Sequence, residues 1–532
     1  MVLAGSAYIA YDQYRKFFSP YADKDASVTA HSSTTTTIQD LSTAIDDDED
    51  EAEPSASVLM IFVHTVRKVA SFIRLTLRVL RLLILFTPVI IYFGYQHYLS
   101  PSSFDSWCRF LVHQMQKGGP CFIKLAQWAG TRKDLFGDTL TNSFSAMHSN
   151  APSHSFAKTR RIIESEFKKP LEEVFSSIEP TPLASGAIAQ VYTAIHDGAQ
   201  VAVKVRHPGV VQHIARDLSI LQFFTKLASY YPPLQWAGLE ENISIFSKSM
   251  VAQTDMRVEA TNLVLFQENF KSFRDTVRFP TPDLTLTTHQ VLVETFERGT
   301  PIQDYLDDTI SNAKYTEAVK QKLSSFGMNM YLKMMLVDNF VHADMHPGNL
   351  LVDQTTGALV VLDAGLVTKL KPKDRVNFMN LFSAVAAGDG ARAAAVMIET
   401  SRNANQIIQN KDAVEGFKKE MKALIDHVII TPMRELEVGV ILEQVLSLGR
   451  KYKVPVDSNF TSMIPGMIVI EGIGKQLNRA YGINFIESSK PFLVKESAVR
   501  DAYIKGVLGN EHPQLYKWYE QTWKSSKWNK DF

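Results

Sequence analysis

The spacing of hydrophobic positions changes along the chain, and each spacing predicts a different kind of element. Residues 82–99 read LLILFTPVIIYFGYQHYL, an apolar run that would span about 27 Å as a helix. That length matches the hydrocarbon core of a bilayer, so the run predicts a transmembrane helix with a kink at Pro88. The polar Gln96 and His97 near its end leave open a second interpretation, a buried helix of a soluble core.

A basic stripe precedes this apolar run. Four arginines recur at offsets that fall on one narrow face of a helix: Arg67, Arg74, Arg78 and Arg81. Residues 58–81 are therefore predicted to form a basic amphipathic helix whose guanidinium groups face anionic lipid headgroups. The alternative is a face that packs against the protein's own core.

Polar residues dominate the first part of the chain. Residues 24–57 are rich in Ser, Thr, Asp and Glu and include DDDEDEAEPS, a composition that cannot repay the entropy of folding. Residues 1–57 are therefore predicted to be a disordered, acidic segment. Its apolar start, VLAGSAYIAY, is too short to cross a bilayer and is interpreted as the remnant of a longer leader.

Alternation of period two appears further along the chain. Between Thr181 and Arg206, two runs rich in Val, Ile and Tyr flank the turn HDGA, which predicts a β-hairpin. Helical patterns are expected at 118–137, in one long helix between Glu240 and Phe270, at 462–477, and through much of the second half. The tryptophan-rich end of the chain could contact a membrane surface or form a docked amphipathic helix.

Composition narrows the class of protein. Apolar residues make up 45% of the chain and charged residues 21%, which supports a largely globular body. Lys+Arg and Asp+Glu both number 56, so the net charge gives no footprint for nucleic acid, and no nucleic-acid partner is expected. Cys108 and Cys121 cannot form a disulfide framework or the usual zinc site, and two buried thiols are expected rather than a bridge between them.

The hairpin carries residues suited to phosphate binding. Small residues let backbone N–H groups approach a phosphate closely, and four of them open the first run: Ala184, Ser185, Gly186 and Ala187. The second run ends VAVK, which places Lys204 on a strand where its ammonium needs an anion, as the VAIK lysine of protein kinases does. Glu259 is predicted to pair with it from the following helix, on a face shared with Asp255 and Asn262. An ordinary solvated helix face is the alternative.

The stretch FVHADMHPGNLLV at 340–352 supplies the other half of a kinase-like site. Asp344 and Asn349 are five residues apart, the interval of the kinase catalytic loop, and Asp363 follows in DAG after an apolar run. Asp344 is expected to orient an acceptor hydroxyl or water, while Asn349 and Asp363 hold Mg²⁺ on the phosphates of ATP. His342 and His346 are expected to shape the loop. The order and spacing of these motifs predict an α+β, two-lobed, kinase-like fold.

These motifs resemble the UbiB family, the aarF-domain-containing (ADCK) atypical kinases. In that family HADxHPGN is the catalytic loop, the metal aspartate lies in a short Asp-x-Gly motif, here LDAGLV, and an alanine-rich loop, here LASGAIAQVY, replaces the glycine-rich loop. A helical extension carries a KxGQ signature, matched here by IKLAQWAGTRKDLF. The details around Trp128 and QTDMRVEA are most similar to the mitochondrial ADCK subgroup two and its fungal relatives.

The resemblance implies how the chain is divided and how its extension acts. It implies a helical extension at 104–165, a small lobe at 166–295 and a large lobe with a helical C-terminal extension at 296–532. Lys124 and Gln127, on one helix face with Thr131, would cover the nucleotide cleft where a peptide substrate would otherwise lie. The chain departs from the family at three positions: Ala126 replaces the signature glycine, Gln253 stands where relatives have glutamate, and Gly186 interrupts the alanine run. The first two would change the family's internal salt-bridge pattern but not the metal site, and the third would bring the loop closer to an ordinary phosphate loop.

The resemblance implies a membrane-anchored atypical kinase or ATPase that uses ATP and Mg²⁺ in coenzyme Q (ubiquinone) or mitochondrial lipid homeostasis. It would be a single-pass protein of the mitochondrial inner membrane, and the positive-inside rule, applied to the arginines before the apolar run, predicts that the body lies on the intermembrane-space side. Its expected partners are an anionic or quinone-like membrane lipid and membrane proteins. Two alternatives remain: a small-molecule phosphotransferase, and a nucleotide-gated lipid-binding scaffold without catalysis.

Overall fold

The computed structural model describes residues 54–99, 104–130, 138–145, 153–230, 239–307, 315–401, 404–431, 438–454, 463–479 and 488–489. Thr131, the tryptophan-rich end of the chain and nearly all of the predicted acidic segment lie outside these residues. The chain divides into two compact units. The first unit comprises residues 1–122 with 211–247, and the second comprises residues 123–210 with 248–532.

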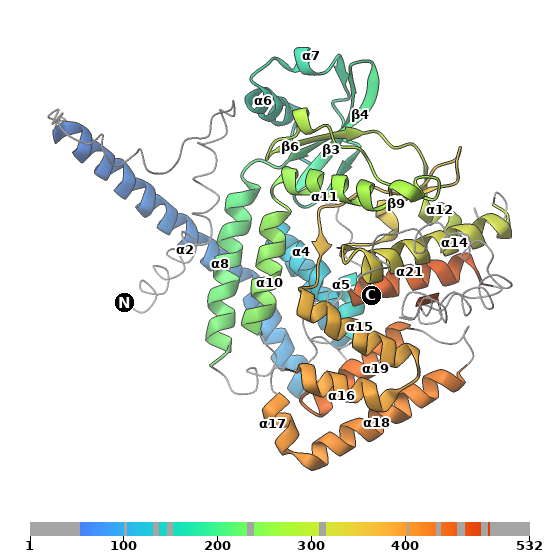
Figure 1. Ribbon diagram of the computed structural model, residues 1–532. Coiled ribbons are helices and arrows are strands. Elements are labelled where there is room, and N and C mark those ends of the chain that lie inside the picture. The colour runs from blue at the N-terminus through green and yellow to red at the C-terminus, as the bar shows by residue number, and fades with distance from the viewer. Residues whose placement is uncertain are drawn as a thin grey trace, which may run out of the picture. The chain divides into compact units, whose positions relative to one another are not determined.

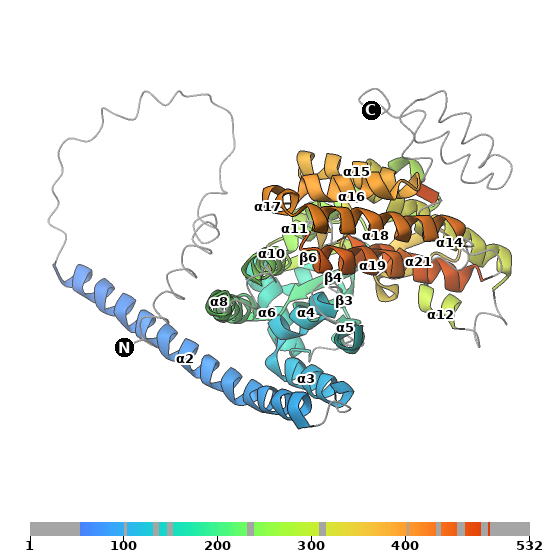
Figure 2. The ribbon, with the colours of Figure 1, turned by 90° about the horizontal axis from the view of Figure 1, so that it is seen from below.

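The first unit is helical. One continuous helix, α2 (Pro54–Leu99), contains both the predicted basic helix and the predicted apolar run, with Pro88 inside it. Helix α3 (Phe104–Gly118) packs against α2, as Figure 2 shows. The unit also contains most of α8 (Val210–Ala228) and of α10 (Leu239–Ala252). Cys108 and Cys121 are buried and take part in no disulfide, which confirms the expectation of two buried thiols.

Helix α2 has a buried stripe and an exposed apolar face. Its buried residues recur every seven positions: Leu75, Leu82, Val89 and Gln96. On this side the Trp107 indole N–H of α3 donates to the Val89 carbonyl at 2.9 Å. Large apolar side chains remain exposed elsewhere on the helix, among them Leu77, Leu80, Leu83, Ile84, Ile90, Ile91 and Tyr98. Among the described residues, Val69–Leu99 is the one helix long and apolar enough to cross a membrane.

The small lobe of the second unit is built on a five-stranded sheet with the order β1-β3-β4-β6, in which β2 also pairs with β3. The predicted hairpin is confirmed: β3 (Ala189–His196) and β4 (Ala199–Arg206) are antiparallel, and Asp197 and Gly198 take positive φ values in the turn. The other strands are β1 (Ser177–Ile178), β2 (Ala184–Ser185) and β6 (Val291–Thr295). Helices α6 (Phe156–Phe167) and α7 (Leu171–Val174) pack on this sheet through a core that includes Ile163, Tyr192, Val203 and Val293.

Helix α11 (Met256–Asn269) lies beside the same sheet (Figure 1). The expectation of one long helix between Glu240 and Phe270 is wrong, because α10 ends at Ala252 and α11 begins at Met256. The Asp255 side chain accepts a hydrogen bond from the Arg257 N–H and so caps α11. Asp255 therefore starts the helix instead of supporting Glu259 from behind.

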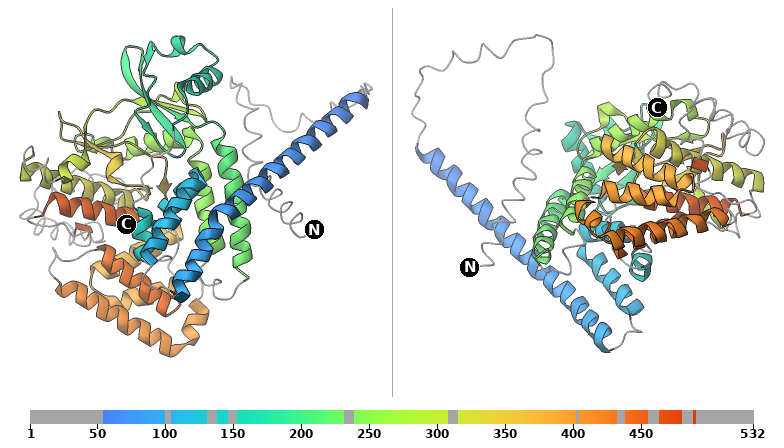
Figure 3. Two further views of the ribbon diagram at one scale, coloured as in Figure 1. Left: turned by 180° about the vertical axis from the view of Figure 1, so that it is seen from behind. Right: turned by 60° about the horizontal axis from the view of Figure 1, so that its bottom comes forward.

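The large lobe combines small sheets with many helices. One sheet has the order β5 (Val277–Arg278), β10 (Leu359–Val361), β9 (Leu350–Val352) and β7 (Thr300–Pro301). A second, two-stranded sheet pairs β8 (Val341–His342) with β11 (Val367–Thr368). The helices are α12 (Ile302–Leu306), α14 (Glu317–Leu332), α15 (Pro372–Ala386), α16 (Gly390–Thr400), α17 (Ala404–Gln409), α18 (Lys411–Ile430), α19 (Val438–Lys451) and α21 (Ile464–Leu477). In Figure 3 the helices from α15 to α21 form the group coloured from orange to red. Helix α21 confirms the helix expected at 462–477.

A π-helical turn, η5 (Lys333–Val337), joins α14 to the strand that precedes the catalytic loop. The Lys333 ammonium and the Asp338 carboxylate form a buried ion pair at 2.6 Å across this turn. Asn339 follows with φ of 49°, and its side-chain amide donates to the Leu370 carbonyl and accepts from the Leu370 N–H. These contacts fix the start of the loop that carries Asp344.

Candidate nucleotide and metal site

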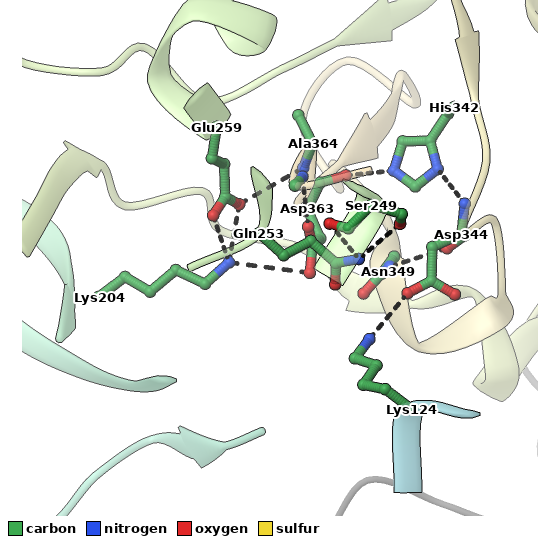
Figure 4. Close-up of polar contacts among 11 residues, drawn as sticks. Lys124, Lys204, Ser249, Gln253, Glu259, His342, Asp344, Asn349, Asp363 and Ala364 are labelled. Atoms are coloured by element: carbon green, nitrogen blue, oxygen red, sulfur yellow. Dashed lines mark hydrogen bonds and ion pairs between the residues drawn. The ribbon is translucent and has the colours of Figure 1, made fainter. Parts of the chain in front are cut away.

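A buried cation lies at the centre of the site. The Lys204 ammonium on β4 contacts both carboxylate oxygens of Glu259 on α11, at 2.7 and 2.8 Å (Figure 4). The Asp363 carboxylate, which follows strand β10, lies 3.7 Å from the same ammonium. The structure thus brings together the lysine and glutamate that were predicted for phosphate binding and the aspartate that was predicted as a metal ligand.

The charges of these groups support one another. Burial alone would lower the pKa of Lys204, but the carboxylates of Asp363 and Glu259 raise it, so Lys204 stays an ammonium. Burial alone would raise the pKa of Asp363, yet the nearby Lys204 and the hydrogen bond from the Gly365 N–H hold it well below its ordinary value. Asp363 is therefore a carboxylate over the whole physiological range.

The residues of the predicted catalytic loop lie next to this group. The buried His342 side chain contacts the Asp363 carbonyl through Nε2, while its Nδ1 accepts from the Asp344 N–H at 3.2 Å. His346 accepts from the Gly348 N–H at 3.1 Å and begins the short 3₁₀ turn η6 (Pro347–Asn349). Both histidines are thus occupied in shaping the loop, as the sequence analysis expected.

Asn349 and Asp363 together offer the ligands that Mg²⁺ prefers. The Asn349 side-chain N–H donates to the Asp344 carbonyl at 3.2 Å, which leaves its amide oxygen available as a metal ligand. One amide oxygen and one permanently ionised carboxylate suit Mg²⁺, which keeps several waters and takes its remaining ligands from phosphates. The described residues contain no cluster of three or more His, Cys, Asp or Glu side chains able to hold a metal. The residues therefore fit a metal that arrives with a nucleotide.

The helical extension reaches the same site. Lys124, on α4 (Pro120–Gly130), donates to the Asp344 carboxylate at 3.2 Å. Burial alone would raise the pKa of Asp344, but Lys124 lowers it, so this carboxylate is ionised and paired with a lysine. Gln127 lies one helical turn further along α4, and Ala126, which replaces the expected glycine, is fully buried.

The small-residue loop is only partly arranged as predicted. The Ser185 hydroxyl is buried and has no hydrogen-bond partner among the described residues, which fits a group awaiting a ligand. Ala184 and Ser185 pair with β3, and the His207 imidazole contacts the Gly186 carbonyl at 3.0 Å. Ala187 is buried, so its methyl group packs inside and only its backbone remains for phosphate binding. Gly186 has no positive φ and a Cβ there would meet only an ordinary contact, so its backbone does not require glycine.

Sequence reasoning missed Glu294, on strand β6. This side chain is 9% exposed, and its Oε2 has no hydrogen-bond partner among the described residues. Burial, reinforced by the neighbouring Glu259 carboxylate, raises the pKa of Glu294 well above its ordinary value. The only signal in the sequence was an acid inside the apolar run VLVET. Gln253, by contrast, donates to the Ser249 hydroxyl at 3.2 Å, and Glu259 alone pairs with Lys204 from α11.

The fold and the site define a two-lobed, kinase-like class: a strand lysine paired with a helix glutamate, an Asp-x4-Asn loop and a strand-borne aspartate. Residues 146–397 match the ABC1 atypical kinase-like domain, and residues 421–481 match the UbiB helical domain. The chain belongs to the ABC1/UbiB family of atypical kinase-like proteins.

Relatives from distant organisms share most of the chain. A probable serine/threonine-protein kinase of Dictyostelium discoideum is 31% identical, over 86% of this chain and 75% of its own. A mitochondrial ABC1 family protein of Schizosaccharomyces pombe is 32% identical, over 85% of this chain and 74% of its own. A mitochondrial ABC1 family protein of Saccharomyces cerevisiae is 32% identical, over 74% of this chain and 69% of its own.

Proposed function

We propose that this protein is a membrane-anchored, atypical kinase or ATPase that binds ATP with Mg²⁺. The observation that carries the proposal is the Lys204–Glu259 ion pair with the Asp363 carboxylate 3.7 Å from the same ammonium. In this role Lys204 and the 184–187 loop hold the phosphates, and Asn349 and Asp363 hold the metal. Mg²⁺ would supply charge neutralisation on the phosphates when it is bound.

Asp344 is proposed to act on the acceptor side. Its carboxylate would orient a hydroxyl or water whose oxygen attacks the γ-phosphorus, while the bond to the β–γ bridging oxygen breaks and ADP leaves. The proton of the attacking oxygen would pass to Asp344. Because the Lys124 ammonium already contacts this carboxylate, a water or a small, lipid-like hydroxyl is a better acceptor than a protein segment.

The Lys124 contact also favours a second function, a nucleotide-gated lipid-binding scaffold without catalysis. A carboxylate that is already ion-paired is a weaker base and is less available to an acceptor. Nucleotide binding would then switch the position of the extension without phosphate transfer. A soluble small-molecule phosphotransferase is less favoured, because the chain carries both α2 and the extension.

The cellular setting is proposed from the relatives and from α2. Two of the relatives are named as mitochondrial, and we propose the inner mitochondrial membrane, a role in coenzyme Q or mitochondrial lipid homeostasis, and membrane lipids and membrane proteins as partners. The length and apolar composition of Val69–Leu99 are compatible with a single pass through α2, and the arginines on its N-terminal side favour a body on the intermembrane-space side. The packing of α3 against α2 favours a different anchoring, with α2 in the plane of the membrane surface.

The nucleotide proposal is tested by measuring Mg²⁺-dependent ATP binding and phosphate release for the full chain with vesicles. Asp363→Asn should weaken Mg²⁺-dependent binding by at least about a hundredfold, since changing even a residue that only hydrogen-bonds to a metal ligand costs about 10- to 100-fold. Asp412→Asn, an exposed carboxylate on α18, is the matched control and should bind as the wild type does. Tight binding without phosphate release would select the scaffold, and no binding at all would contradict both functions.

Lys124→Met separates the enzyme from the scaffold further. Removing the partly exposed ion pair should raise phosphate release about twofold to fivefold, because Asp344 becomes free to contact an acceptor. Lys169→Met, an exposed lysine in the same unit, is the control. A fall in release with unchanged nucleotide affinity would show instead that Lys124 takes part in the chemistry.

A further inference from the structure

A cavity of about 240 Å³ lies within the first unit, apart from the nucleotide site. It is a partly open pocket bordered by α2, α8 and the link between α3 and α4, and it is lined by Arg78, Arg81, Lys117, Gly118, Gly119, Pro120, His213, Arg216 and Asp217. The volume is far above the roughly 10–15 Å³ that one water needs. The cavity therefore has room for a group the size of a phosphate.

One arginine of this cavity has a structural role. Arg78 donates to both carboxylate oxygens of Asp217 at 2.7 Å and also to the Gly118 carbonyl. The Asp217 side chain is 2% exposed, so this is a buried bidentate pair within the protein. Arg78 therefore follows the alternative interpretation of the basic stripe, because its guanidinium faces the protein and not a lipid headgroup.

Among the described residues, the other basic side chains of the cavity are not paired with a carboxylate in this way. Arg81 and Lys117 are exposed, and Arg216 donates from Nε only to the Gln212 carbonyl. Within the part of the chain that the structure describes, none of these three side chains contacts a carboxylate. Since Asp217 already neutralises Arg78, the cavity carries a surplus of positive charge suited to a bare anion.

The position of the cavity on α2 points to the source of that anion. At about 100° per residue, Arg74 and Arg81 lie roughly 100–120° around the helix from the centre of its exposed apolar face. They fall at the boundary between that face and the buried stripe through Leu75 and Leu82. A helix that lies in a membrane interface places its basic residues at this boundary, at the level of the lipid phosphates.

The packing of α3 argues that α2 lies along the membrane in this arrangement. Trp107 fixes α3 to the middle of the apolar run through the Val89 carbonyl. Helix α3 also carries the exposed charged residues Asp105, Arg109 and Lys117, which would be costly to bury in hydrocarbon. The run 82–99 cannot cross a bilayer in this packing without taking α3 with it.

We propose that this cavity binds the phosphate of an anionic phospholipid, whose bilayer surface covers the exposed apolar face of α2. Arg81, Lys117 and Arg216 would contact the phosphate oxygens, while Arg78 and Asp217 hold the cavity wall. The acyl chains would lie against the side of α2 that carries Leu80, Leu83 and Ile84. The proposal keeps the membrane anchoring of the proposed function but replaces its single pass with an in-plane helix, and it does not depend on nucleotide binding.

The test uses flotation of the full chain with vesicles and no nucleotide. One set of vesicles is pure phosphatidylcholine, and the other contains equal parts of phosphatidylcholine and phosphatidylglycerol. Arg81→Gln/Arg216→Gln should lower the affinity for the anionic vesicles on the order of thirtyfold, since each basic residue at an anionic surface contributes about fivefold. Arg81→Lys/Arg216→Lys should restore binding.

The matched control is Arg109→Gln/Lys226→Gln, which makes the same change in net charge on α3 and α8 outside the cavity. Equal losses in the two double variants would overturn the site in favour of diffuse attraction. Equal binding of wild type to both kinds of vesicle would overturn the phosphate assignment. Binding of inorganic phosphate that Arg81→Gln/Arg216→Gln abolishes, without vesicle binding, would replace the lipid with a free anion.

The orientation of α2 is tested with Val66→Cys/Tyr98→Cys, because both positions are exposed and the native cysteines are buried. After reconstitution into sealed vesicles, an impermeant maleimide should label both new thiols or neither if α2 lies in the plane. Molecules labelled at a single position would show that α2 crosses the bilayer, which would overturn the in-plane part of the proposal. Nucleotide affinity in detergent, measured separately, distinguishes failure here from failure of the nucleotide proposal.

Discussion

Lys204 and Arg81 are both cations beside apolar surface, yet their surroundings differ completely. Lys204 is within 3.7 Å of two carboxylates, those of Glu259 and Asp363, whereas Arg81 contacts none among the described residues. In the candidate nucleotide site, the carboxylates of Glu259, Asp363 and Asp344 outnumber the ammonium groups of Lys204 and Lys124. In the cavity of the first unit the cations are in excess.

Whether acidic or basic groups are in excess decides what each region can bind. A site with excess carboxylate repels a polyphosphate unless a divalent cation comes with it, which is why a nucleotide at Lys204 should require Mg²⁺. A site with excess ammonium and guanidinium binds an anion directly and is weakened by salt. Chelation should therefore abolish binding in the first region and leave binding in the second unchanged.

The comparison is tested most severely by Glu259→Gln. Removing one partner of the buried pair should lower the free energy of unfolding by about 3 kcal/mol, because the Lys204 ammonium stays buried with less compensation. Arg81→Gln, an exposed position, should change it by less than about 0.5 kcal/mol. Denaturant unfolding measures both, and equal effects would contradict the contrast. Lys204→Met/Glu259→Met should be less damaging than Glu259→Gln alone.

Trp107→Phe tests whether Trp107 holds α3 against the apolar run of α2 in the first unit. The change removes the hydrogen bond to the Val89 carbonyl and part of a buried side chain, and should cost about 2 kcal/mol. Hydrogen exchange should become faster in α2 around Val89 and stay unchanged in β4 around Lys204. Unchanged exchange in α2 would mean that α3 does not hold the apolar run.

Glu294→Gln should have a smaller effect than Glu259→Gln and Trp107→Phe, and it tests the excess of acidic groups around Lys204. The folded state keeps Glu294 protonated above the pH at which the unfolded chain ionises it, near 4.3, so wild-type stability falls as pH rises from there through the raised pKa. Glutamine cannot ionise, so the variant should gain about 1 kcal/mol over wild type at the upper end of this window. Thermal unfolding across pH measures the gain. Parallel profiles for the two proteins would show that Glu294 ionises normally.

The sequence was sufficient to predict those features that depend on the spacing of apolar residues and on the order of motifs along the chain. The hairpin followed from alternation around HDGA, and the grouping of Lys204, Glu259 and Asp363 followed from their order along a kinase-like chain. The strand and helix periods fix which face each of these side chains occupies.

Other features depended on residues distant in sequence. Arg78 shares its helical stripe with Arg74 and Arg81, and only Asp217, 139 residues later, turns it toward the protein. The break between α10 and α11 contains neither proline nor glycine, so no strong stop signal marked it. Glu294 was overlooked because an acid on a strand is usually solvated, and burial of both sheet faces is decided by packing.

The π-helical turn at Lys333–Val337 determines the direction in which the chain enters the predicted catalytic loop. Its widened hydrogen bonding, seen in the Asp338 N–H donating to the Lys333 carbonyl, accommodates one residue more than an α-helical turn would. A chain one residue shorter here would return to regular helix and rotate everything after it by about 100°. Insertions and deletions should therefore be tolerated in the surface turns of this fold but not in this turn. Here the number of residues determines where the loop that carries Asp344 lies.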